Sequence, residues 1–135
     1  MLEARTLSVS VDRPWRELYE AIWRPEVFPQ WASSLSQSSL QPEGTSWRAE
    51  GPEGVVTIRF TDHNAFGIMD HVVTLASGAD VYVPLRVVLN GNGAEILLTL
   101  FRQPGMSAEK FAADADWVRR DLQRLQAQFS TKRIL

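Results

Sequence analysis

One long amphipathic segment near the C-terminus limits the folds open to this chain. Apolar residues hold one helical face over about 22 residues after Ser107, which corresponds to roughly 33 Å of helix. The face consists of Phe111, Ala115, Val118, Leu122, Leu125 and Phe129. Ser107 is a good N-cap for this helix. Asp121 is predicted to pair with Arg124 on the more solvent-exposed side of the helix. A helix of this length with one apolar face has to pack across a sheet.

Six short runs with strand character occupy the middle of the sequence. They are predicted at residues 36–41, 46–50, 55–63, 67–76, 80–89 and 94–102. Turn-forming residues separate the runs, and the Asn90-Gly91 pair is the strongest hairpin signal among these turns. Because connections this short make consecutive strands antiparallel neighbours, the six runs are predicted to form a meander.

The N-terminal part supplies one further strand and two short helices. Leu7, Val9 and Val11 alternate with polar residues, which indicates a half-buried strand. An apolar helical stripe follows between Pro14 and Pro25. The residue before a proline is pushed out of the helical region, so the first helix ends there and a second, shorter helix is predicted over 27–35.

The order of these elements predicts an α+β fold. We expect a seven-stranded curved antiparallel sheet wrapped around the long C-terminal helix, with the two short helices closing one end. A sheet that curves around a helix leaves an internal cavity between the two. Ligand pockets are concave, mostly apolar and few per protein, so this space is the leading candidate for a functional site.

Length and composition restrict the classes of function. The 135 residues are predicted to form a single domain, 1–135, with residues 130–135 as a flexible tail. The absence of cysteine excludes disulfides, a thiolate nucleophile and cysteine-ligated metals. A net charge of −2 disfavours a nucleic-acid partner. The N-terminus lacks the apolar run of a signal peptide and no stretch is long enough to span a bilayer, so we expect a cytoplasmic protein without membrane insertion.

Several segments resemble those of a known superfamily. They are the opening strand into Pro14-Trp15, the segment 25–31, residues 66–71 (FGIMDH) and residues 99–107 (TLFRQPGMS). On these segments the chain resembles the START-related SRPBCC superfamily, and most closely its polyketide cyclase-like branch. The resemblance implies the helix-grip fold, with a cavity that holds a small hydrophobic molecule such as a lipid, a quinone or a polyketide. A fold shared by many functions does not choose among them.

The two histidines are the first candidates for chemistry. His63 and His71 are predicted to lie too far apart along the sheet to share one metal ion, so no metal or other cofactor is expected. His71 alternates with apolar residues and is predicted to point inward, opposite Ile58. There it is a candidate general acid or base, or the polar anchor of a ligand. The alternative is a core histidine bonded to a backbone carbonyl.

The remaining candidates are polar or aromatic residues near the expected cavity. Asp62 is predicted at the inward-facing end of its strand, whereas Asp70 is predicted at the surface. Arg86 is expected to point outward unless a bulge at Pro84 reverses the face, in which case a buried guanidinium would imply an anionic ligand group. The aromatic rings are interpreted either as core or as cavity wall. The candidate ligand-binding residues are Trp31, Trp47, Phe60, Asp62, His71 and Arg86.

Three functions remain open on the sequence. The first is binding of a small hydrophobic ligand in the cavity. The second is an enzyme of the polyketide cyclase or dehydrase kind, in which His71 is the catalytic acid or base. The third is a protein-interaction module or homodimer that uses the strand face bearing Tyr82 and Phe101.

Overall fold

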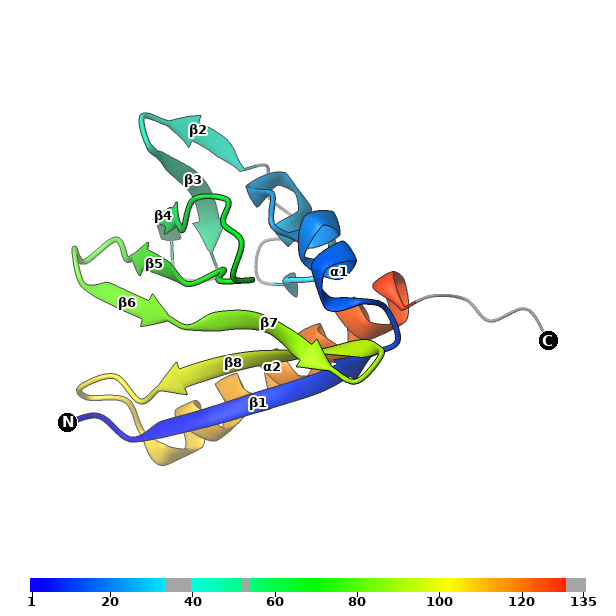
Figure 1. Cartoon of the computed structure of the whole chain (residues 1–135). Coiled ribbons are helices and arrows are strands. Elements are labelled where there is room, and N and C mark those ends of the chain that lie inside the picture. The colour runs from blue at the N-terminus through cyan, green and yellow to red at the C-terminus, as the bar shows by residue number, and fades with distance from the viewer. Residues whose placement is uncertain (34–39, 52–53, 131–135) are drawn as a thin grey trace.

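Antiparallel strands curve over one side of a long C-terminal helix in the computed structural model, which describes residues 1–33, 40–51 and 54–130 (Figure 1). The elements are β1 (Ala4–Val11), α1 (Trp15–Ile22), the 3-10 helix η1 (Pro25–Gln30), β2 (Gln41–Glu43), β3 (Ser46–Gly51), β4 (Gly54–Phe60), β5 (His71–Thr74), β6 (Asp80–Val83), β7 (Leu85–Asn90), β8 (Gly93–Phe101) and α2 (Ala108–Phe129). The α+β class, the antiparallel pairing and the long C-terminal helix are therefore confirmed. Most of the strand predicted at 36–41, and residues 131–135 of the predicted tail, lie outside the described residues.

The described strands form two sheets rather than the single seven-stranded sheet that was predicted. One sheet has the order β1-β8-β7, and the other has the order β2-β3-β4-β5-β6. The predicted strand 80–89 is divided at Pro84, which has no N–H to donate to a ladder. Before the proline β6 pairs with β5, and after it β7 pairs with β8. Pro84 does not reverse the face, because Leu85 and Val87 are buried and continue the alternation of Val83.

The helix α2 packs with the face that its periodicity predicts. Leu122 and Leu125 are buried in the core, and Phe111 and Ala115 are buried further toward the N-terminus of the helix. Figure 1 shows α2 running along the far side of β1, β7 and β8. The helix contacts β1, where the Gln126 side chain donates a hydrogen bond to a backbone carbonyl. These contacts fix α2 as one wall of the molecule.

The second of the two short helices is shorter and tighter than predicted. Helix α1 covers the expected region, whereas η1 is a 3-10 helix that ends at Gln30; residues 34 and 35 of the helix predicted over 27–35 lie outside the described residues. Pro29 lies inside η1 and has no N–H for an α-helical bond. At the end of η1 the N–H of Trp31 donates to the carbonyl of Phe28 at 3.1 Å, a three-residue step. This turn directs Phe28 and Trp31 into the interior, where both are buried.

An irregular segment, rather than a tight hairpin, connects β4 to β5. The Asn64 carboxamide accepts hydrogen bonds from the N–H groups of Phe66 and Ile68. Gly67 has φ +71°, and a Cβ at this position would lie 2.3 Å from the carbonyl oxygen of Val87, so only glycine allows the segment to approach β7 this closely. Strand β5 therefore begins at His71, four residues later than predicted.

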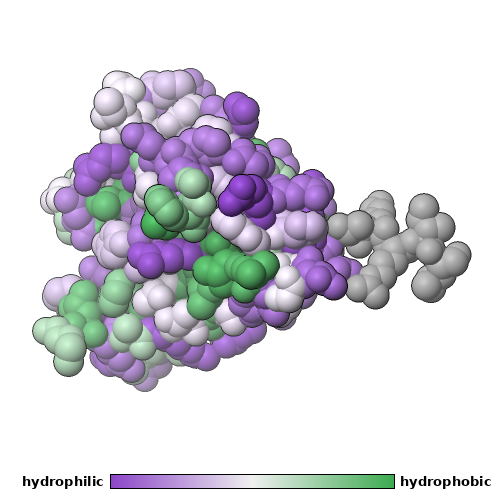
Figure 2. Space-filling view, in the orientation of Figure 1, coloured by the Kyte–Doolittle hydropathy of each residue, from purple (hydrophilic) through white to green (hydrophobic). Residues whose placement is uncertain are grey.

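The face of the molecule seen in Figure 2 is mostly hydrophilic. Figure 2 shows that the apolar side chains on the visible face form separate patches among polar ones. Within residues 1–33, 40–51 and 54–130, no helix is both long and apolar enough to cross a membrane.

Candidate functional site

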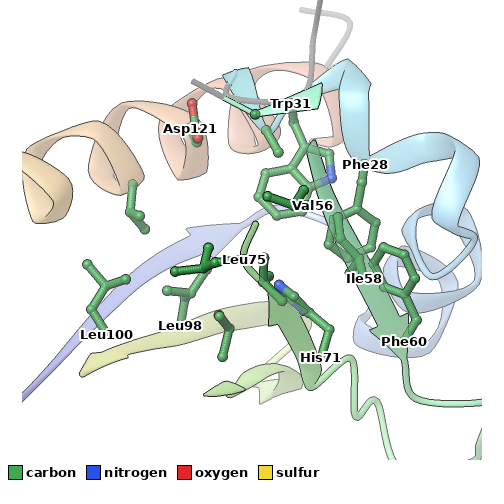
Figure 3. Close-up of a pocket in the computed structure, with 15 residues that line it drawn as sticks. Phe28, Trp31, Val56, Ile58, Phe60, His71, Leu75, Leu98, Leu100 and Asp121 are labelled. Atoms are coloured by element: carbon green, nitrogen blue, oxygen red, sulfur yellow. The ribbon is translucent and has the colours of Figure 1, made fainter. Parts of the chain in front are cut away.

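A pocket of about 290 Å³ lies between the strands, α2 and η1 (Figure 3). The residues that line it are Phe28, Trp31, Ala32, Gly51, Val56, Ile58, Phe60, His71, Val73, Leu75, Val83, Leu98, Leu100, Val118 and Asp121. Strands β4, β5, β6 and β8 supply most of the wall, and α2 supplies Val118 and Asp121. Among the described lining residues, His71 and Asp121 are the titratable ones.

The strand register places a row of side chains at one end of the pocket. The Cα partner of His71 is Phe60 on one side and Val83 on the other, and all three residues line the pocket. The predicted partner of His71, Ile58, instead pairs with Val73. The prediction was two residues out of register because the irregular segment before β5 is longer than the turn that was assumed.

His71 lies among aromatic rings and bonds to the backbone. Its ring centroid lies 5.5 Å from that of Phe28, edge to face, and 5.6 Å from that of Phe60. Its Nδ1 lies 3.1 Å from the carbonyl oxygen of Met69. Burial lowers the pKa of His71 below its ordinary value, and the bond to Met69 and the charge of Asp70 offset this only in part. The ring is therefore neutral at neutral pH.

The other ring nitrogen of His71 faces the pocket. Figure 3 shows the imidazole pointing into the space bounded by Trp31, Leu75 and Leu98. No hydrogen-bond partner of Nε2 is present in the part of the chain that the structure describes. His71 thus combines the two interpretations made from the sequence: it is bonded to a backbone carbonyl, and it also lines the pocket.

Trp31 forms part of the pocket wall opposite the strands. Its side chain is 3% exposed, and its carbonyl accepts a hydrogen bond from Nη1 of Arg124 at 3.3 Å. The indole Nε1 is buried and has no hydrogen-bond partner among the described residues. A buried donor without a partner lowers the stability of the fold. Packing, and not a hydrogen bond of the indole nitrogen, therefore holds the Trp31 ring in the pocket wall.

Asp121 is a pocket residue that the sequence did not reveal. It was predicted to pair with Arg124 on the wetter side of α2, and the two side chains do approach to 3.7 Å. The carboxyl group is nevertheless buried and lines the pocket beside Val118. Burial raises the pKa of Asp121, while hydrogen bonds from Ser33 and the charge of Arg124 oppose the rise. One feature of the sequence does indicate this burial: Asp121 follows Val118 by three residues and so lies at the edge of the apolar helical face.

Asp70, which was predicted at the surface, is 8% exposed and central to a polar cluster on the outer side of the sheet. Its Oδ2 accepts hydrogen bonds from the Tyr82 hydroxyl at 2.6 Å and from Nη2 of Arg86 at 3.0 Å. Its Oδ1 accepts one from the Leu85 N–H at 2.9 Å. Burial by itself would raise the pKa of Asp70, but these hydrogen bonds and the Arg86 charge outweigh it and hold the pKa below its usual value.

The other candidate residues do not reach the pocket. Arg86 points outward and pairs with Asp70, so it has a partner within the chain. Asp62 is exposed, because β4 ends at Phe60 and the alternation does not continue beyond it. Trp47 is the cross-strand partner of Ile58 and shares its face, but it lies outside the pocket wall. The structure therefore brings together Trp31, Phe60 and His71 of the six candidates.

A second hollow of about 450 Å³, more polar than the first pocket, lies on the outer side of the same strands. It is lined by Thr45, Arg59, Phe60, Thr61, Asp62, Asp70, His71, Val72 and Tyr82. Phe60 and His71 line both this hollow and the apolar pocket. This pair of residues therefore forms the boundary between the apolar pocket and a more polar space.

The other histidine belongs to a different part of the surface. The ring of His63 stacks on Tyr19 and Trp23, and its Nε2 lies 2.7 Å from the carboxylate of Glu20. Across the described residues, no three side chains of His, Asp or Glu are grouped so that they could hold a metal ion.

Comparison with solved structures finds the same fold at low sequence identity. The protein XoxI from Bacillus cereus matches with a TM-score of 0.74 and 14% identity, over 95% of this chain and 96% of its own. DynU16, a protein of the dynemicin biosynthetic locus, matches with a TM-score of 0.66 and 20% identity, over 92% of this chain and 46% of its own. Ara h 8.0201 matches with a TM-score of 0.66 and 12% identity, over 95% of this chain and 97% of its own. No protein-family model matches the sequence, and neither does any curated protein.

At these identities the likeness shows the fold alone. These structures match over 92–95% of this chain, so they share its overall arrangement of strands and helices. Because proteins with one fold carry out many functions, a function for this chain has to be argued from its own pocket.

Proposed function

We propose that this protein is an SRPBCC-type helix-grip protein that binds a small hydrophobic molecule in its apolar pocket. The observation that carries the proposal is the composition of the wall, in which aliphatic and aromatic side chains surround His71 and Asp121. Ligand pockets in proteins are lined in this way, by apolar groups with a few polar ones that fix orientation. The volume of about 290 Å³ is suited to a small molecule. DynU16, a structural neighbour, comes from a biosynthetic locus, which agrees with a small-molecule role.

A neutral apolar dye tests the proposal directly. N-phenyl-1-naphthylamine should fluoresce more strongly on binding and should quench tryptophan fluorescence, because Trp31 lines the pocket. Val73→Phe should weaken dye binding by about fivefold or more, since the added ring fills part of the pocket, overpacking costs roughly 1–3 kcal/mol and 1.4 kcal/mol is one factor of ten. The measurement is the dissociation constant from a fluorescence titration.

The matched control is a valine outside the pocket. Val88 lies on β7, is 39% exposed and does not line the pocket. Val88→Phe should bind the dye as the unmodified protein does. Thermal unfolding of both variants establishes that each is folded. If a folded Val73→Phe variant bound the dye with unchanged affinity, the dye would occupy another site and the proposal would be rejected.

A second candidate function is acid–base catalysis on the bound molecule. The observation that favours it is Nε2 of His71, an unpartnered nitrogen on a neutral ring that faces the pocket. A group of this kind can accept a proton from a substrate near neutral pH. Apart from His71, none of the six candidate site residues places an acid or a base on the pocket wall. The other titratable residue that lines the pocket is Asp121, so His71 would act alone or with Asp121.

His71→Gln distinguishes catalysis from binding alone. The molecule that co-purifies with the protein, identified by mass spectrometry after extraction, is incubated with fresh protein and followed for conversion. Under the catalytic hypothesis the variant should turn over about 10²-fold more slowly while it still binds the dye, because glutamine cannot shuttle a proton. Under the binding hypothesis the molecule remains unchanged, and its affinity falls by about tenfold or less, the scale of one neutral hydrogen bond. We expect the second result.

The protein-interaction role remains a prediction. Tyr82 is half exposed on the outer face and already donates its hydroxyl proton to Asp70, while Phe101 is partly buried at the end of β8. The same holds for the homodimer and for the cytoplasmic location.

A further inference from the structure

The polar groups of the pocket differ in what remains available to a ligand. Asp121 interacts with Ser33 and lies 3.7 Å from Arg124, and its Oδ1 is buried beyond the reach of solvent without a hydrogen-bond partner among the described residues. The indole nitrogen of Trp31 is buried beyond the reach of solvent. His71 is different, because its Nδ1 is occupied by Met69 and its Nε2 has no partner among the residues that the structure describes. Nε2 of His71 is therefore the polar atom that a ligand can engage.

The backbone contact determines which kind of hydrogen bond Nε2 can form. A carbonyl oxygen only accepts hydrogen bonds, so Nδ1 of His71 has to carry the proton that it shares with Met69. A neutral imidazole has one N–H, and the proton on Nδ1 leaves Nε2 with a lone pair. The burial that lowers the pKa of His71 keeps the ring in this neutral form. Nε2 is therefore a hydrogen-bond acceptor aimed into an apolar space.

We propose that the molecule bound in this pocket carries a hydroxyl group, of an alcohol or a phenol, that donates a hydrogen bond to Nε2 of His71. The inference rests on the proposed function and adds a chemical requirement to the same site. A ketone or an ether would place an acceptor against an acceptor. A carboxylate or an ammonium group would have to lose its hydration in an apolar wall, which is costly for a charge. A neutral hydroxyl satisfies Nε2 without that cost.

The position of His71 also orients the ligand. Phe60 and His71 line both the apolar pocket and the more polar outer hollow, so the hydroxyl lies at the end of the pocket nearest the more polar surroundings. Figure 3 shows Leu98 and Leu100 on the side of the pocket away from Phe60. The apolar body of the ligand extends from His71 toward these leucines and α2. The predicted ligand class is thus a mainly apolar molecule with a hydroxyl at one end.

Three probes with the same carbon skeleton test the inference. They are 1-naphthol, which has a hydroxyl donor, 1-methoxynaphthalene, which has an acceptor oxygen only, and naphthalene, which has neither. Dissociation constants are measured by tryptophan quenching for the unmodified protein and for His71→Phe. Comparing the ratio of affinities between proteins cancels the different hydration of the probes in water.

The dissociation constant of each of the other two probes is divided by that of 1-naphthol. This ratio should be about three- to tenfold larger for the unmodified protein than for His71→Phe, which is the range of one neutral hydrogen bond. His63→Phe is the matched control, because it removes the other histidine, which lies outside the pocket. This control should keep the preference of the unmodified protein. If circular dichroism shows that His71→Phe is not folded, His71→Leu takes its place.

The outcomes separate the inference from the proposed function. If the ratios of the dissociation constants of the three probes are the same for the unmodified protein and for His71→Phe, the pocket binds apolar molecules and the hydroxyl requirement is wrong. If 1-methoxynaphthalene is the preferred probe, Nε2 carries the proton and the assignment of the ring is wrong. If none of the probes binds and the dye does not bind either, the proposed function itself fails.

Discussion

Replacing Leu122 by alanine is expected to lower the free energy of unfolding by about 2–5 kcal/mol, as truncations of buried leucines do. Leu122 is 1% exposed and belongs to the core cluster between α2 and the strands. The substitution removes buried apolar atoms and leaves a cavity that the surrounding strands can fill only in part. Urea unfolding followed by circular dichroism measures the change.

The neighbouring residue provides the control for this prediction. Gln123 follows Leu122 on α2 and is exposed. Gln123→Ala should change the stability by no more than about 0.5 kcal/mol, because surface substitutions on a helix rarely cost more. Equal, small effects of the two substitutions would mean that α2 packs against the strands with another face, and the assignment of the core would be wrong.

Replacing Asp70 by alanine is expected to cost about 2–4 kcal/mol, since hydrogen bonds to a charged group are worth roughly 1.5–3 kcal/mol each and a buried donor is left unpaired. The carboxylate accepts hydrogen bonds from Tyr82, Arg86 and the buried N–H of Leu85. Arg86 is half exposed and can return to water, but the Leu85 N–H cannot. The loss is therefore dominated by the backbone donor and the hydroxyl.

Asp62→Ala is the control for this substitution, and pH gives a second measurement. Asp62 lines the same outer hollow but is exposed, so its removal should cost about 0.5 kcal/mol or less. The pKa of Asp70 is lower in the folded protein than in the unfolded chain, where an aspartate titrates near about 3.9. The stability that the carboxylate contributes is thus present above about pH 4 and is lost as the pH falls through the folded pKa. Asp70→Ala should lack this part of the acid dependence, and an unchanged dependence would contradict the role given to Asp70.

Local periodicity accounts for the parts of the fold that were predicted correctly. The positions of α2 and β1 follow from apolar residues that repeat at 3.6 and at 2 residues, and these repeats appear within a single element. Leu7, Val9 and Val11 do turn inward, and the apolar face of α2 is buried around Leu122. The burial of one face requires no knowledge of the partner element, so the sequence is sufficient.

The candidate site was predicted less well because its geometry depends on contacts between distant residues. The face of His71 followed from alternation, but its partner across the sheet depends on the irregular segment that Gly67 allows to approach β7. Asp121 lies at the border of the apolar face of α2. Its burial depends on contacts with residues outside α2, such as the hydrogen bonds from Ser33, and no pattern within α2 indicates them.

The sequence alone determined the α+β class, the antiparallel order of strands, the long helix and the face that it buries. Each of these follows from local patterns of apolar residues and turns. The tertiary structure decided that Pro84 divides one strand between two sheets, and that Asp70 is buried by Tyr82 and Arg86. It also decided that His71 keeps one nitrogen free toward the pocket, because the hydrogen bond to Met69 and the surrounding rings exist only once the strands have paired.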